Sequence, residues 1–140
     1  MSSHDIKSVL LIGGSGFLGL HLIEQFYKNN STTKISVFDV RPLPEKLSKQ
    51  FTFNPKNIKF FKGDLTSADD VSKAIKESEA DVLVHSASPM HGGKTEIYQK
   101  VNVEGTENVL RVAKESGIKA FVYTSSAGVI FNGQDIHNAD

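Results

Sequence analysis

The 140-residue chain contains no cysteine, and its sixteen basic and sixteen acidic side chains leave it without net charge. The lack of cysteine excludes a disulfide framework, a thiolate metal site and a cysteine nucleophile. The neutral balance argues against nucleic acid as a partner, because nucleic-acid binding depends on a basic surface. The longest apolar runs, such as 9–12 and 82–84, are too short to cross a bilayer. No transmembrane segment or secretory signal pattern is therefore expected.

Short apolar runs alternate with longer segments of helical period along the whole chain. This alternation is typical of βαβ units and a parallel sheet, and 140 residues are the length of one domain. We predict an α/β fold with a Rossmann-like, doubly wound parallel sheet, truncated after about five strands, in one domain over 1–140. The first and fourth strands are continuous apolar runs and should be central. The strands are expected at 8–12, 34–39, 57–62, 81–85 and 120–124.

Three helices are expected between these strands, over 17–28, 66–76 and 95–116. Ser67, followed three residues on by Asp70, gives the second helix a start that resembles a capping box. Apolar residues at helical spacing should face the sheet. They are Leu18, Leu22, Ile23 and Phe26 in the first helix, Val71, Ala74 and Ile75 in the second, and Ile97, Val101, Val109, Val112 and Ala113 in the third.

Two glycines mark the third helix. Gly117 stands where a helix commonly ends on a residue of left-handed conformation. Gly105 lies inside the helix, where glycine lowers stability. Close packing or the approach of a ligand should therefore explain Gly105.

The segment 41–62 holds six basic residues against one acidic residue. We interpret it as a solvated face or an insertion, with a membrane-surface patch as the alternative. Pro42, Pro44 and Pro55 interrupt the segment, so the sequence predicts only a short helix near 45–50.

A glycine-rich turn follows the first strand directly and opens the first helix. From Gly14 onward it reads G-x-G-x-x-G, in which the glycines permit a tight turn, the approach of a pyrophosphate and close packing of the helix. The helix N-terminus adds free N–H groups and the positive end of its dipole. Glycines also serve ordinary turns, so the pattern needs support from its context. The residues of the turn are Gly13, Gly14, Ser15, Gly16, Phe17, Leu18 and Gly19.

Asp39 supplies that context, because it lies twenty residues after Gly19 at the end of the second strand. A carboxylate there can accept hydrogen bonds from an adenosine ribose, although a helix cap or a turn is the alternative role. Strand, glycine turn, helix, strand and acid in this order predict a dinucleotide-binding site. Asp39 favours NAD, because it would repel a 2′-phosphate. Arg41 could instead pair with that phosphate, so NADP stays open.

Motifs along the chain resemble those of a known family. Beside the glycine turn they are Asp64-Leu65, His85-Ser86-Ala87-Ser88, Asn102-Val103-Glu104-Gly105-Thr106 and the run 123–129. Together they resemble the extended short-chain dehydrogenase/reductase family, and within it the 3β-hydroxysteroid dehydrogenase branch. The stretches 38–41, 43–54, 87–92 and 129–135 resemble its decarboxylating members that act on 4α-carboxy sterols in fungi. The resemblance covers essentially all 140 residues.

The resemblance implies further cofactor-binding residues at the ends of the third and fourth strands. Asp64 would accept a hydrogen bond from the adenine amino group, with Leu65 packing nearby; otherwise Asp64 is a loop aspartate. Ser86, Ala87 and Ser88 would form a wall of small residues along the cofactor. As plain turn residues they would need no function.

The same resemblance places Asn102 and Thr124 near the cofactor, although an asparagine in a helix more often faces solvent. Ser125 and Ser126 are the catalytic candidates. By the family pattern, the Ser126 hydroxyl would donate to the sterol C3 oxygen, with Ser125 as the second candidate and a capping or turn serine as the alternative. If the fifth strand extends so far, Thr124 and Ser126 share one of its faces.

In the family, a tyrosine acts as general base and a lysine four residues later lowers its pKa. This chain has no Tyr-x-x-x-Lys, since Tyr27, Tyr98 and Tyr123 are followed at the fourth place by other residues. We expect Tyr98 to be a packing residue. No metal is expected either, because the spacing of His85, His91 and His137 fits neither a zinc site nor a catalytic triad.

Three hypotheses follow for the function. The chain is the N-terminal cofactor-binding part of an NAD(P)-dependent dehydrogenase that oxidises the 3β-hydroxyl of a 4α-carboxy sterol with loss of the C4 carboxylate, and is inactive alone. Alternatively, a second chain completes the enzyme, or the chain is a non-catalytic dinucleotide-binding or scaffold module. The resemblance also implies peripheral association with the endoplasmic reticulum membrane and other sterol C4-demethylation proteins as partners. We expect a partly exposed fifth strand and marginal stability.

Overall fold

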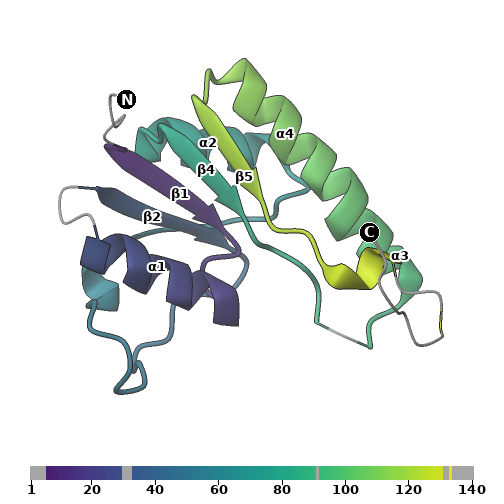
Figure 1. Cartoon of the computed structure of the whole chain (residues 1–140). Coiled ribbons are helices and arrows are strands. Elements are labelled where there is room, and N and C mark those ends of the chain that lie inside the picture. Colours follow the sequence, from purple (N-terminus) through teal and green to yellow (C-terminus); the bar gives the residue numbers. More distant parts are fainter. Residues whose placement is uncertain (1–5, 30–32, 91, 131–132, 134–140) are drawn as a thin grey trace.

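The computed structural model describes residues 6–29, 33–90, 92–130 and 133. Within this part of the chain, one parallel sheet has the strand order β3-β2-β1-β4-β5. Figure 1 shows β2, β1, β4 and β5 side by side in this order. Each strand expected from the sequence is present, with bounds shifted by two residues at most. The strands are β1 (Ser8–Ile12), β2 (Lys34–Asp39), β3 (Lys59–Lys62), β4 (Val82–His85) and β5 (Ala120–Tyr123).

Helices connect these strands at the places that the sequence predicts. The second begins at the predicted cap, because the Ser67 side chain accepts a hydrogen bond from Asp70 N. Gly117 has the predicted left-handed conformation, with φ +72°. His91 and His137 lie outside the described residues. The helices are α1 (Phe17–Asn29), α2 (Ala68–Ser78), α3 (Thr95–Tyr98) and α4 (Thr106–Glu115), with short 3₁₀ turns at Pro55–Asn57 and Ala127–Ile130.

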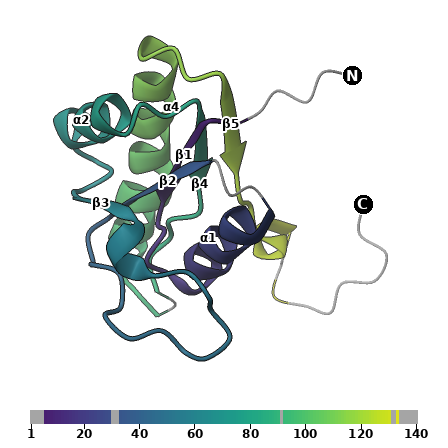
Figure 2. The same ribbon diagram turned by 90° about the vertical axis from the view of Figure 1, so that its left-hand side faces the viewer.

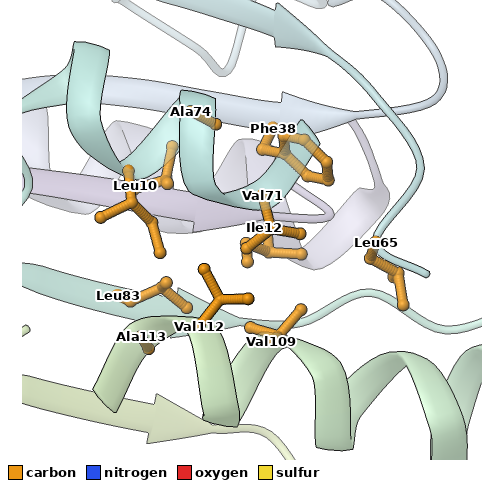
Figure 3. Packing of buried hydrophobic residues seen from close by; sticks show 11 residues of the cluster. Leu10, Ile12, Phe38, Leu65, Val71, Ala74, Leu83, Val109, Val112 and Ala113 are labelled. Carbon is orange, nitrogen blue, oxygen red and sulfur yellow. The ribbon is translucent and has the colours of Figure 1, made fainter. Parts of the chain in front are cut away.

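The sheet lies between α1 on one face and α2 and α4 on the other (Figure 2), and a cluster of buried apolar side chains fills each side. Alternate residues of β1 point to opposite faces, so Leu10 and Ile12 pack against α2 and α4, while Val9 and Leu11 pack towards α1. Figure 3 shows the first layer, in which Leu83 of β4 lies close to side chains of α4. β1 and β4 are buried along their full length, which confirms that they are central.

Two predictions about the helical faces are wrong. Leu18 is 45% exposed, because α1 rests on the sheet through Gly19 and Ile23. Ile97 is 47% exposed, because it lines a cavity at the carboxyl ends of the strands and does not pack in the core. The predicted burial of Val109 and Val112 in α4 is confirmed.

The connection from β2 to β3 contains no helix at 45–50, so that prediction is also wrong. Glu24 of α1 holds the connection instead. Its carboxylate accepts hydrogen bonds from Thr52 N, Thr52 Oγ1 and Phe53 N at 2.9, 2.8 and 3.3 Å. Phe53 is buried against α1 and the sheet, and the basic side chains of the connection, such as Lys46, are exposed. This agrees with the expected solvated insertion.

The long helix expected over 95–116 is continuous but changes its winding in the middle. Gln99–Gly105 forms a π-helix between α3 and α4. Such segments are rare and concentrate at functional sites. No helix among the described residues combines the length and the apolar character that a membrane span requires.

Candidate functional site

A cavity of about 370 Å³ opens at the carboxyl ends of β1, β2, β3 and β4. The chain runs from β1 to β2 on one side and places β4 on the other side of β1. Open α/β sheets bind ligands at such a reversal of strand order. Nine of the residues predicted for the cofactor site line the cavity: Gly13, Gly16, Asp39, Arg41, Asp64, Leu65, Ser86, Ala87 and Ser88.

Three glycines of the turn are required by close contacts within the protein. Gly13 has φ +83°, and a Cβ there would lie 2.6 Å from Ala87 Cα. A Cβ on Gly14 would lie 2.7 Å from Val37 Cγ2, and one on Gly19 would lie 2.5 Å from Gly14 Cα. These glycines therefore join the turn to the neighbouring loop, to β2 and to α1.

Gly16 differs from the other three, because a Cβ there would meet only the carbonyl oxygen of Gly13, at 3.3 Å. Its open side faces the cavity. The buried Oγ of Ser15 has no hydrogen-bond partner among the described residues. Phe17 and Leu18 are exposed, but their N–H groups belong to the first turn of α1, where helical N–H groups lack intrahelical acceptors. Backbone and side-chain donors thus remain available for an anion.

Asp39 is buried at the end of β2, with 8% of its surface exposed. One carboxylate oxygen accepts a hydrogen bond from Ser15 N and the other from Arg41 N, each at 3.1 Å. A carboxylate oxygen can accept two hydrogen bonds, so each retains capacity for a ligand hydroxyl. The carboxylate is therefore fixed between the glycine turn and the cavity.

Asp64 follows β3 and forms the turn into α2. Its carboxylate accepts hydrogen bonds from Thr66 N and Thr66 Oγ1 at 2.9 and 2.8 Å, and these bonds lower the pKa of Asp64. This is the loop role named as the alternative, yet Asp64 also lines the cavity. Leu65 is buried, and a Cβ on Gly105 would lie 1.8 Å from its Cδ1. Close packing thus explains Gly105.

Two walls of the cavity can be distinguished: the glycine turn forms the first, and the loop after β4, residues 86–88, forms the second. Ser86 N and Ser86 Oγ both donate to the carbonyl oxygen of Ile12, at 2.9 and 3.2 Å, which ties the loop to β1. Ala87 lies against Gly13. Val40 and Met90 are exposed apolar residues that the sequence analysis did not assign to the site, and they complete the lining together with Ile97, which was expected to face the sheet. Val40 directly follows the carboxyl end of β2, and Met90 lies in the loop after β4, so their positions in the chain could have indicated that they line the site.

Besides five residues of the glycine turn, four predicted residues lie outside the lining of the cavity. Asn102 lies in the π-helix and its buried Oδ1 has no partner among the described residues, so it does not simply face solvent. Thr124 donates to the carbonyl oxygen of His85 through N and Oγ1. β5 ends at Tyr123, so Thr124 and Ser126 do not share a strand face. Ser126 Oγ accepts from Gly128 N at 3.1 Å, as a turn serine does, and Ser125 is exposed.

Tyr98 holds the end of the β4 loop, which agrees with the predicted packing role. Its hydroxyl donates to the carbonyl oxygen of Met90 at 2.8 Å and accepts from Gly93 N at 3.3 Å. His85, to which the sequence analysis assigned no chemistry, lies fully buried between β5, the long helix and this loop. Tyr98 and His85 together hold the loop after β4, which forms the second wall of the cavity, in place.

Curated relatives match almost the entire chain. It is 70% identical to the decarboxylating sterol-4-alpha-carboxylate 3-dehydrogenase ERG26 of Candida albicans, over 99% of this chain and 39% of the relative. The Saccharomyces cerevisiae ERG26 protein is 67% identical, over 96% and 39%. The human sterol-4-alpha-carboxylate 3-dehydrogenase is 37% identical, over 99% and 34%. The chain therefore spans about two fifths of the length of its fungal relatives.

Solved structures show the same fold. An epimerase of Methanothermobacter thermautotrophicus superposes with a TM-score of 0.76 at 25% identity, over 99% of this chain and 40% of the other. UDP-glucose 4-epimerase of Thermus thermophilus, in its complex with NAD, gives 0.72 at 23% identity, over 94% and 42%. The sequence also matches a protein family over residues 10–140. This chain belongs to the 3-beta hydroxysteroid dehydrogenase/isomerase family.

Proposed function

We propose that this chain is the dinucleotide-binding part of an NAD-dependent sterol-4α-carboxylate 3-dehydrogenase. The observation that carries the proposal is the position of Asp39, whose carboxylate lies in the cavity and is fixed by the N–H of Ser15 in the glycine turn. In this position Asp39 would accept from the ribose directly beside a helix N-terminus that suits an anion. The match to sterol dehydrogenases over almost the whole chain supports the substrate class.

The residues present fit such a cofactor. The open side of Gly16 suits a pyrophosphate at the start of α1, as does the Ser15 hydroxyl, which has no partner within the described part of the chain. Asp39 would bind the adenosine ribose, and Asp64 with Leu65 would border the adenine. The loop 86–88 would lie along the cofactor as a wall of small residues. The buried Asn102 Oδ1 offers a further acceptor, and Thr124 would contact the cofactor from the end of β5.

The preference for NAD over NADP rests on Asp39. A carboxylate with both oxygens already fixed would repel a 2′-phosphate. Arg41 is exposed, and its backbone N–H is what holds Asp39. The Arg41 side chain, two residues after Asp39, could instead favour NADP.

Calorimetric titration of the chain with NAD and with NADP tests this assignment. We expect NAD to bind more tightly, Asp39→Ala to weaken NAD binding at least tenfold, and Arg41→Ala to leave NAD binding nearly unchanged. Unaltered NAD affinity in Asp39→Ala would show that the role given to Asp39 is wrong. Failure of the unchanged chain to bind either dinucleotide would overturn the proposal.

NAD supplies a hydride acceptor for C3 of the sterol. The proton of the 3β-hydroxyl must pass to a base, and C3 becomes a ketone. The bond from C4 to its carboxylate then breaks, carbon dioxide leaves, and the electron pair is taken up by the new ketone as an enolate that is protonated. We propose that Ser126 donates to the C3 oxygen, with Ser125 as the second candidate. A tyrosine-lysine pair supplied by a longer protein would act as the base.

A chimera tests the catalytic part of the proposal. This chain would replace the matching 39% of the Candida albicans relative, with which it shares 70% identity. We expect the chimera to form NADH from a 4α-carboxy sterol and the isolated chain to form none. In the chimera, Ser126→Ala should lower kcat about a hundredfold, as is usual for loss of a positioned donor, and Ser125→Ala much less. Equal, small losses would remove both serines from the catalytic site.

We further propose that the protein works peripherally at the endoplasmic reticulum membrane, together with other proteins of sterol C4 demethylation. The support is the sterol substrate of its relatives, since sterols reside in membranes. Fractionation of cells that express the chimera tests this proposal. Recovery of the chimera entirely in the soluble fraction would contradict it.

A further inference from the structure

His85 lies at the carboxyl end of β4 and is completely buried. Its Nδ1 lies 3.3 Å from Ala87 N in the cavity wall, and its Nε2 lies 2.9 Å from Thr106 Oγ1 at the start of α4. The rings of Phe121 and Tyr123 on β5 flank the imidazole, with centroids 6.4 and 5.4 Å away. One side chain therefore connects the sheet, the long helix and the cofactor cavity.

The two hydrogen bonds determine the tautomer of this ring. The backbone N–H of Ala87 can only donate, so Nδ1 of His85 must be the unprotonated acceptor. The proton of the neutral ring is then on Nε2 and is donated to Thr106 Oγ1. A protonated ring would carry a second N–H opposite the Ala87 amide. Burial disfavours that form and lowers the pKa of His85 to about 4.

Ala87 transmits the position of this ring to both walls of the cavity. Its Cα and N atoms lie so close to Gly13 that an added Cβ there would be 2.6 Å from each. A shift of Ala87 would therefore change the contact with the glycine turn, as well as the wall formed by residues 86–88. Small displacements of groups that position a ligand have large effects on binding.

We propose that His85 is a positioning residue for the dinucleotide site, where its Nδ1 fixes the Ala87 amide and so sets the separation of the two walls. This inference rests on the proposed function, because it assigns His85 a role in binding NAD. It goes beyond that function in naming a residue that need not contact the cofactor. It also assigns the hydroxyl of Thr106 the task of holding the ring in the required tautomer.

A pair of amide variants tests the proposal in the chain as it is. In His85→Asn, the amide oxygen lies where Nδ1 was and can still accept from Ala87 N. In His85→Gln, the amide lies nearer the place of Nε2, and the Ala87 amide loses its acceptor. We expect calorimetry to give an NAD affinity within about threefold of the unchanged chain for His85→Asn and a loss of tenfold or more for His85→Gln.

The ¹⁵N-resolved amide resonance of Ala87 gives a second readout that a general loss of stability would not imitate. It should stay near its original shift in His85→Asn and move in His85→Gln. Thr106→Val and Thr106→Ser form a matched pair on the other side of the ring. We expect weaker NAD binding only in Thr106→Val, which retains the shape of threonine but lacks the hydroxyl. These variants keep the test decisive if a substitution of His85 prevents folding.

The outcomes separate this inference from the proposed function. Failure of the unchanged chain to bind NAD would overturn the proposed function and the role of His85 with it. Normal binding by the unchanged chain, with equal losses in His85→Asn and His85→Gln, would overturn only the role of His85. Unchanged affinity in Thr106→Val would do the same.

Discussion

Leu65 occupies the space that any side chain at Gly105 would need, since a Cβ there would lie 1.8 Å from Leu65 Cδ1. The contact joins the last residue of the π-helix to the loop after β3. Because Leu65 also lines the cavity, the packing of the long helix and the shape of the cofactor site depend on the same contact.

Gly105→Ala should therefore destabilise the protein, although alanine favours helix. Overpacking of this kind typically costs about 1–3 kcal/mol, against a gain in helix propensity of up to about 1 kcal/mol. Urea denaturation followed by circular dichroism measures the difference. The same substitution in a Leu65→Ala background should cost much less, because the clash is gone. An equal cost in both backgrounds would show that Leu65 is not the reason for the glycine.

The glycines of the turn should divide into two classes. Gly14→Ala should lower the free energy of unfolding by about 1–3 kcal/mol, because its Cβ would lie 2.7 Å from Val37 Cγ2. Gly16→Ala should change that free energy little and weaken NAD binding at least tenfold, because its new methyl group would extend into open space beside the cavity. Paired urea and calorimetric titrations check both. A Gly16→Ala variant with normal NAD affinity would contradict the pyrophosphate assignment.

The strands and the glycine turn could be predicted because their signals are local. A central parallel strand such as β1 must be apolar throughout, and three of the four glycines of the turn lie in contacts that leave no space for a side chain. Asp39 could be predicted because the end of β2 and the turn are adjacent in any sheet of this order. The order of strand, turn, helix, strand and acid was enough to predict these features, although the contacts that require Gly13 and Gly14 come from Ala87 and Val37.

The errors arose where tertiary contacts decide. The segment 45–50 is not a helix but part of a connection that hydrogen bonds to Glu24 of α1 hold in place. The sequence of the segment itself does not indicate these hydrogen bonds, because Glu24 belongs to a distant element. The π-helix at 99–105 has no local sequence signal beyond the unusual position of Gly105 inside a helix. His85 received no role because its partners, Ala87 and Thr106, become meaningful only when the long helix is placed beside β4.

Glu24 should contribute more to the free energy of unfolding than an exposed charged residue does. Burial alone raises its pKa, but hydrogen bonds from Lys28, Thr52 and Phe53 outweigh this and lower the pKa to about 2. Glu24→Gln should lower the free energy of unfolding at pH 7 by on the order of 2 kcal/mol. The exposed pair of Lys34 and Glu79 provides the control, because Glu79→Gln should change stability by less than about 0.5 kcal/mol. Equal effects of the two substitutions would refute the anchoring role.

His85 should make stability depend on pH between about 6.5 and 4. Its pKa is about 4 in the folded protein against an ordinary value of 6.5, so the unfolded chain takes up the proton first as the pH falls. The stability due to neutral His85 is complete above pH 6.5 and decreases towards pH 4, by about 3 kcal/mol in all.

His85→Asn removes the titrating group and should flatten this slope, whereas Glu24, with a pKa lowered from 4.5 to about 2, contributes its own loss only below pH 4.5. Unfolding by urea at pH 7, 6, 5 and about 4.5 distinguishes the two groups. If the free energy of unfolding of His85→Asn kept the full pH dependence of the unchanged chain over this range, another group would be responsible. The assignment of a buried, neutral His85 ring would then be wrong.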